Sequence, residues 1–94
     1  MTKEKLSAIT YIKLLANDLL DKKENVGIGY TVKDLFLDAE IIANEIIAEC
    51  EAFNLTDIQM SAEDLIFHIY NPTTAKELNN CIDTTMCRIL EICE

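Results

Sequence analysis

The segment TVKDLFLDAEIIANEIIAECEAF, residues 31–53, decides the fold because its apolar residues recur at the spacing of an α-helix. Thr31 is a good N-cap residue with Asp34 three positions later, a variant of the capping box. Asn54 suits the left-handed position that ends many helices. We therefore predict a helix over about residues 32–53. Its broad apolar arc, suited to a core, comprises Val32, Leu35, Phe36, Ala39, Ile42, Ala43, Ile46, Ile47, Cys50 and Phe53.

A second, narrower apolar stripe sets this helix apart from an ordinary core helix. Leu37, Ile41, Ala48 and Ala52 form it, with Asn44 beside them. The four-three-four spacing from Leu37 to Ala48 is the step of a helix–helix seam, in which Asn44 can fix register. Either another helix of the chain covers this stripe or a second molecule does, and the sequence leaves both open. The candidate oligomer interface, most simply of a homodimer, is Leu37, Ile41, Asn44 and Ala48.

The boundary between the two stripes is acidic and carries Asp34, Asp38, Glu45 and Glu49. A solvated helix face explains such charges without any function. The functional alternative is that these carboxylates engage Lys or Arg on a partner protein and occlude its basic surface. In a closely related alternative, the carboxylates imitate the phosphates of nucleic acid, and the protein blocks a nucleic-acid enzyme. These four acids are the candidate partner-binding residues.

Three further helices complete the predicted fold. The first spans about residues 3–23, capped by Thr2, and Leu6 and Leu14 extend its apolar set. Thr56 with Gln59 forms one capping box, and Ser61 with Asp64 resembles another. We therefore predict a short turn of helix over 55–61 and then a short helix over 62–70, which Pro72 stops. Thr74 and Glu77 form a capping box that opens a last helix over about 74–93. The predicted fold class is all-α: a small helical bundle of three long helices plus one short helix, in a single domain of residues 1–94.

The charge of the chain restricts its partners. It has 94 residues, with 17 acidic and 8 basic side chains and a net charge of −9. Nucleic acid and anionic lipid repel such a chain, so we expect no direct nucleic-acid binding. The excess of acidic over basic residues is confined to residues 34–94, because residues 1–33 carry six lysines against four acids. No apolar run reaches the roughly 18 residues of a membrane span, and no signal peptide is evident. We therefore expect a cytoplasmic protein without membrane contact.

The four cysteines and the single histidine offer little for catalysis or metal binding. Cys81, Cys87 and Cys93 are six residues apart, so they point to different sides of one helix and cannot converge on zinc. Asp64 and His68 are one turn apart, but opposite the apolar side of their helix. No nucleophile lies beside a base in the pattern. We expect a non-enzymatic protein with reduced cysteines, no cofactor and no metal.

The connector between the first two helices holds the only glycines, Gly27 and Gly29. Glycine backbone before a helix N-terminus can present N–H groups to an anion, although turn geometry is the plainer explanation of such glycines. Flanking lysines make the local field positive, and Tyr30 is suited to stack on a base. The alternative function is therefore a binder or sponge of a small anionic ligand such as a nucleotide. Its candidate residues are Lys22, Lys23, Gly27, Gly29, Tyr30, Thr31 and Lys33.

These observations favour a small acidic intracellular protein that acts by binding another protein, as a regulator or inhibitor. The expected partner has a basic surface, because the candidate binding residues are carboxylates. Small acidic inhibitors of this kind are often encoded by viruses and mobile elements. The expectation of such an origin is based on the size and charge of the chain alone.

Overall fold

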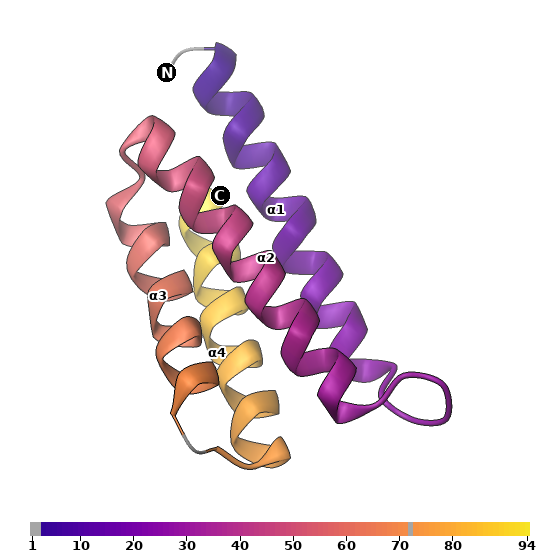
Figure 1. Ribbon diagram of the computed structural model, residues 1–94. Helices are drawn as coiled ribbons and strands as arrows, with labels where there is room; N and C mark the ends of the chain where they lie inside the picture. The colour runs from indigo at the N-terminus through magenta and orange to yellow at the C-terminus, as the bar shows by residue number, and fades with distance from the viewer. Residues whose placement is uncertain (1–2, 72) are drawn as a thin grey trace.

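The computed structural model describes residues 3–71 and 73–94, which form four α-helices (Figure 1). Successive helices run antiparallel, and the contacts follow the order α1, α2, α3, α4 and back to α1. This arrangement confirms the predicted all-α class with four helices. Thr2 and Pro72, expected to cap one helix and stop another, lie outside the described residues. The helices are α1 (Lys3–Glu24), α2 (Val32–Phe53), α3 (Thr56–Tyr70) and α4 (Ala75–Cys93).

Local capping interactions fix both ends of α2 where the sequence predicts them. The Thr31 hydroxyl accepts the Asp34 N–H at 3.2 Å, and the Asp34 carboxylate accepts the Thr31 N–H at 2.9 Å. At the other end Asn54 adopts the left-handed conformation, with φ 58° and ψ 43°. Thr74 and Glu77 form the same reciprocal box at the start of α4. Each box satisfies backbone N–H groups that a helix start otherwise leaves without partners.

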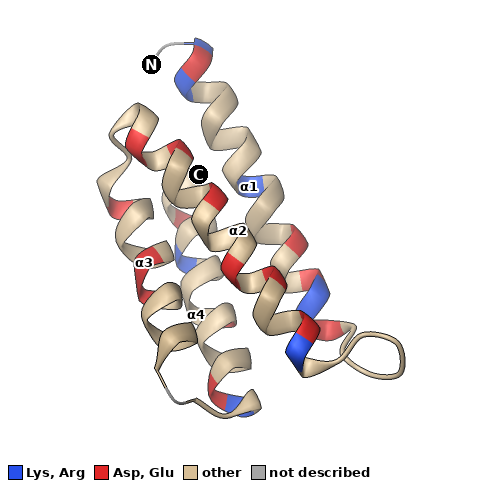
Figure 2. Ribbon diagram, viewed as in Figure 1, with Lys and Arg blue, Asp and Glu red and all other residues tan. Residues whose placement is uncertain are grey.

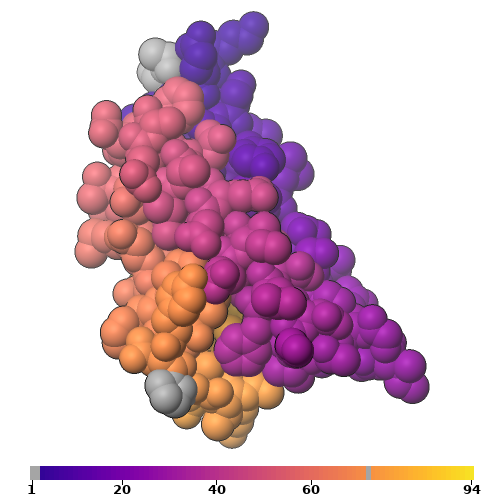
Figure 3. All heavy atoms as spheres, viewed as in Figure 1, coloured from indigo at the N-terminus to yellow at the C-terminus, as the bar shows by residue number. Residues whose placement is uncertain are grey.

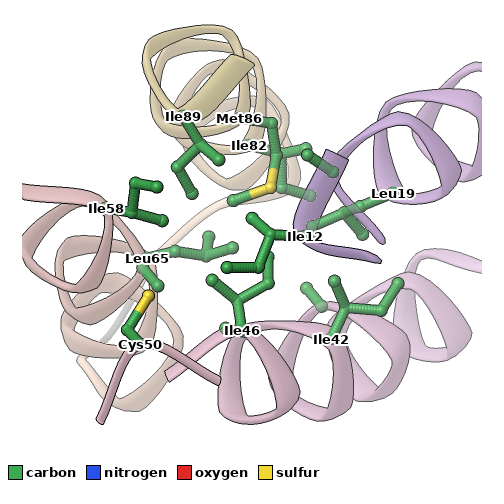
Figure 4. Close-up of a cluster of buried hydrophobic side chains, with 14 of the residues drawn as sticks. Ile12, Leu19, Ile42, Ile46, Cys50, Ile58, Leu65, Ile82, Met86 and Ile89 are labelled. Carbon is green, nitrogen blue, oxygen red and sulfur yellow. The ribbon is translucent and has the colours of Figure 1, made fainter. Parts of the chain in front are cut away.

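The core is aliphatic and draws on all four helices (Figure 4). Ile12, Ile46, Leu65 and Ile82, one from each helix, are completely buried. No aromatic side chain is among the fully buried residues that the structure describes. From the predicted core arc of α2, six residues are buried: Leu35, Ala39, Ile42, Ala43, Ile46 and Cys50.

The third helix begins earlier than the sequence analysis predicts. α3 is continuous from Thr56, whereas the prediction placed a helix start near Ala62. Ser61, expected to cap that start, is 1% exposed within the helix. Neither glycine nor proline interrupts residues 56–70, and Ile58, Ala62 and Leu65 bury one side of an unbroken helix. The Ser61–Asp64 spacing resembled a capping box, but the burial of one continuous face overrides it.

The apolar set of α1 is also narrower than predicted. Leu6 and Leu14 are 57% and 64% exposed, so they do not belong to the core. The buried positions of α1 are Ala8, Ile12, Ala16 and Leu19, which lie between its two neighbours α2 and α4. The opposite side of α1 faces outward. Among the described residues, no helix has the combined length and apolar character needed to cross a bilayer.

Candidate protein-binding surface

The outward side of α2 carries the second apolar stripe, and no other described element covers it. Leu37 and Ile41 are each 55% exposed, and Asn44, Ala48 and Ala52 are exposed as well. α1 and α3 pack against α2, and α4 barely touches it, so the stripe lies outside those contacts. The sequence left two alternatives open for what covers this stripe. The structure excludes one of them, because no helix of the described chain covers it. The stripe is a solvent-exposed apolar surface.

α3 widens this surface with side chains that the sequence analysis did not select. Phe67 and Tyr70 are 63% and 66% exposed on α3, whereas Met60, which is 60% exposed, lies toward α4 near Arg88 and Ile92. Met60 and Phe67 are seven residues apart, two turns of one helix, but the predicted break near residue 62 separated them. The side of the bundle formed by α2 and α3 is turned toward the viewer in Figure 3. We define the α2–α3 face as Leu37, Ile41, Asn44, Ala48, Phe67 and Tyr70.

The predicted acidic edge lies on the α1 side of the stripe, where it also joins α1 to α2. The Tyr11 hydroxyl of α1 donates to the Glu45 carboxylate at 2.9 Å. This hydrogen bond raises the pKa of Tyr11, and the negative charge of Glu49 adds to the effect. A neutral tyrosine donor leaves the carboxylate charged. This hydrogen bond holds the Glu45 side chain in position beside α1.

The other two acids of the edge are held by the α1–α2 connector. The Tyr30 hydroxyl donates to Asp38 at 2.5 Å, and burial together with this hydrogen bond raises the pKa of Tyr30. Asp34 accepts hydrogen bonds from the backbone and side chain of Thr31, which lower the pKa of Asp34. Three of the four predicted partner-binding acids thus have structural roles as well. Their charges are held at fixed points along one side of the stripe.

A second row of acids lies on the α3 side of the stripe. Glu40 lies next to the Tyr70 hydroxyl of α3, and this interaction raises the pKa of Tyr70. Glu51 lies on the same side of α2 by its helical position and is exposed. Lys33 is the single basic residue of α2 (Figure 2). The apolar stripe is therefore flanked by carboxylates on both sides.

The glycine connector does not assemble the anion site that its composition suggested. The Gly27 N–H donates to the Tyr30 carbonyl and the Tyr30 N–H to the Gly27 carbonyl, so both donors are used within the turn. The N–H of Thr31 is taken by Asp34. Lys22 pairs with Asp18 at 3.8 Å, and Lys23 pairs with Glu24 and Asp83. Lys33 is exposed on α2. The geometry therefore gives no support to the anion-binding alternative.

A groove of about 470 Å³ between α3 and α4 is a further concave feature. It contains His68 and Cys81, and Arg88 lies 3.5 Å from Asp64 beside it. Burial raises the pKa of Cys81, which disfavours a reactive thiolate. Within residues 3–71 and 73–94, no three His, Cys, Asp or Glu side chains converge as metal ligands do. The full lining is Asp64, His68, Glu77, Asn80, Cys81, Thr84, Thr85 and Arg88.

The chain was compared with known families, proteins and structures. No family model, curated protein or solved structure matches it. Any functional argument therefore depends on the surface of this molecule alone.

Proposed function

We propose that this chain is a small regulator or inhibitor that works by binding another protein through the α2–α3 face. The observation that carries the proposal is the exposed apolar stripe of α2 between two rows of carboxylates. An apolar centre with a charged rim is the usual anatomy of a protein interface. Isolated exposed apolar residues need no explanation, but a row of them along one helix, with further exposed aromatic residues on the adjacent helix, favours a binding role.

The charge of the rim restricts the partner. α2 carries one lysine against six acids: Asp34, Asp38, Glu40, Glu45, Glu49 and Glu51. A partner with Lys or Arg around an apolar ridge would place opposite charges together, whereas an acidic partner would be repelled. The proposed mechanism is occlusion of such a basic surface, with apolar contact supplying affinity and the rim supplying selectivity.

The positions of the rim acids support preorganised recognition. Hydrogen bonds from Tyr11 and Tyr30 hold Glu45 and Asp38, and Tyr70 lies against Glu40. Because these carboxylates are already oriented, less side-chain entropy is lost when a partner binds. A homodimer through the same stripe was the other expectation from the sequence. Two copies of α2 placed face to face would oppose their acidic rows, so charge disfavours that symmetric arrangement.

A designed peptide tests the proposal without knowledge of the natural partner. The probe is an amphipathic helical peptide of leucine and lysine. The control peptide has the same sequence with every lysine replaced by glutamate. We expect the lysine peptide to bind and the glutamate peptide not to bind, as measured by isothermal titration calorimetry at 0.15 M salt. Leu37→Ser with Ile41→Ser should weaken binding at least about tenfold, since it removes apolar contact without changing charge.

The matched control removes two exposed apolar side chains outside the α2–α3 face. Val26→Ser with Ile28→Ser in the α1–α2 connector should leave peptide binding unchanged. Equal binding by the α2 variant and the wild type would mean that the peptide senses only net charge. That result would reject the α2–α3 face as the binding surface.

A further inference from the structure

The outward side of α1 differs in charge from the rest of the molecule. Seventeen acids occur in the chain, yet none lies between Lys5 and Asn17. Leu6 and Leu14 are exposed there, and Lys3 and Asn17 are exposed beside them. Lys13 is partly exposed on the same side by its helical position. Figure 2 shows no acidic position in this middle part of α1. We define the α1 face as Lys3, Leu6, Lys13, Leu14 and Asn17.

We infer that the α1 face of one copy docks on the α2–α3 face of another, so that this chain is itself a partner of the proposed binding surface. The inference rests on the proposed function, because it names an occupant for the same face. A basic, leucine-bearing helix is the chemistry that an apolar stripe with an acidic rim selects.

The two faces also match in length. The leucine-bearing part of the α1 face runs from Leu6 to Asn17, and the α2 stripe runs from Leu37 to Ala48. Both distances are eleven residue steps, or about 16 Å along a helix at the standard rise. Leu6 and Leu14, about 12 Å apart along α1, can therefore both lie within the span from Leu37 to Ala48. At 0.15 M salt the Debye length is about 8 Å, so charges at the contact outweigh the repulsion between the net charges of two copies.

Such a contact is heterologous, because each copy uses two different surfaces. The two faces belong to different helices, so one molecule can use its α1 face and its α2–α3 face at the same time. Heterologous contacts give rings when they close and open chains when they do not. An α2-to-α2 dimer, by contrast, would stop at two copies and bring the acidic rows together. The two arrangements can be separated by variants that disable one face each.

Two double variants disable the faces separately. Asn44→Lys with Glu51→Lys makes the α2–α3 face basic, and neither side chain forms a hydrogen bond or ion pair with another described residue. Lys3→Glu with Lys13→Glu makes the α1 face acidic. Masses are measured by sedimentation velocity across micromolar to millimolar concentrations at 0.15 M salt with reductant. We expect the wild type to associate. Each variant alone should need a concentration at least about tenfold higher than the wild type to associate to the same extent.

Mixing the variants gives the decisive result. The α2 variant retains a basic α1 face, and the α1 variant retains an acidic α2–α3 face, so their mixture should associate at concentrations at which neither variant associates alone. The two altered faces also carry opposite charges, so they do not oppose this association. As charge controls, Glu91→Lys with Glu94→Lys at the C-terminal end of α4, and Lys76→Glu on its first turn, should associate like the wild type. Unchanged helical circular dichroism verifies that all variants are folded.

Two outcomes would overturn the inference. A wild type that stays monomeric at millimolar concentration shows that the faces do not recognise each other. An α1 variant that dimerises like the wild type shows a symmetric α2 contact instead. Binding of the leucine–lysine peptide to the same wild-type sample separates the two proposals. If the peptide binds and the copies do not, the proposed function stands and only self-recognition is rejected.

Discussion

The two glycines of the α1–α2 connector occupy one tight turn but have different backbone requirements. The residues from Gly27 to Tyr30 close this turn by paired backbone hydrogen bonds of 2.8 and 3.3 Å. Gly29 has φ +89°, whereas Ile28 has an ordinary negative φ, a combination that fits a type II turn with glycine in its third position. Gly27 has no positive φ. The turn explains why the chain has a glycine at position 29.

This difference predicts opposite results for two alanine substitutions. A Cβ atom would meet nothing within 4 Å at either glycine, so crowding plays no part. Gly29→Ala forces alanine into the left-handed region and should lower the free energy of unfolding by about 1 kcal/mol. Gly27→Ala should leave it unchanged or raise it by up to about 1 kcal/mol, because the unfolded chain loses freedom. Urea denaturation measures both, and equal effects would contradict the turn assignment.

At the scale of whole elements, α3 shows where sequence patterns mislead. Two Ser/Thr-x-x-acid/amide patterns, at Thr56 and at Ser61, both resemble helix starts. Neither pattern caps the helix: α3 begins after Leu55 without a side-chain cap, and long-range packing sets its extent because it buries Ile58, Ser61, Ala62 and Leu65 against its neighbours. The α2 bounds were predictable because the Thr31 and Asn54 caps act locally. The exposed pair Met60 and Phe67 was not predictable once the helix was divided.

The continuity of α3 can be tested at Met60, whose side chain is 60% exposed. Comparison of Met60→Ala with Met60→Gly isolates the backbone, because both variants remove nearly the whole side chain. Inside a helix glycine is less favourable than alanine by about 1 kcal/mol. We therefore expect Met60→Gly to unfold at a lower urea concentration than Met60→Ala. Closely similar midpoints would indicate that residues 56–61 are a loose turn, as the sequence suggested.

At the scale of the whole molecule, α2 is joined to its surroundings by tyrosines. The chain has three tyrosines, and each lies against a carboxylate of α2: Tyr11 of α1 at Glu45, Tyr30 of the connector at Asp38, and Tyr70 of α3 at Glu40. From the sequence alone, Tyr30 belonged to a candidate ligand site and Tyr70 to a helix end. The pairing was not predictable because Tyr11 and Glu45 are 34 residues apart, and Tyr30 meets Asp38, eight residues away, only through the fold of the connector.

The same pairs explain why the binding surface was only partly predictable. The periodicity of α2 identified Leu37, Ile41, Asn44 and Ala48 as a separate stripe, and all four are exposed. Whether another helix would cover them depended on the packing of four helices, which no local pattern encodes. The acidic residues beside the stripe could be identified from the sequence. Their fixation by tyrosines depends on the positions of α1, the connector and α3.

Tyr30 makes this fixation measurable through pH. Its folded-state pKa is raised by burial and by the hydrogen bond to Asp38, whereas an unfolded tyrosine ionises near pH 10. Below that pH both states are protonated, and the stabilisation is fully present. As pH rises above about 10 the unfolded state loses its proton first, so the stabilisation declines. At pH 7, Tyr30→Phe should cost about 1 kcal/mol, the usual net value of one hydrogen bond.

The difference between wild type and Tyr30→Phe should therefore shrink as pH rises from 9 to 11 in urea denaturation. Other groups titrate in this range, but they are common to both proteins and cancel in the difference. Tyr70→Phe provides a comparison at a tyrosine that is 66% exposed, where the hydrogen bond to Glu40 is the largest cause of the raised pKa, so its difference from the wild type should shrink in the same direction. A difference that stayed constant or grew with pH would mean that Tyr30 does not hold the connector against α2. The acidic row would then lose its fixed position at Asp38, and the preorganised rim would be limited to Asp34, Glu45 and Glu40.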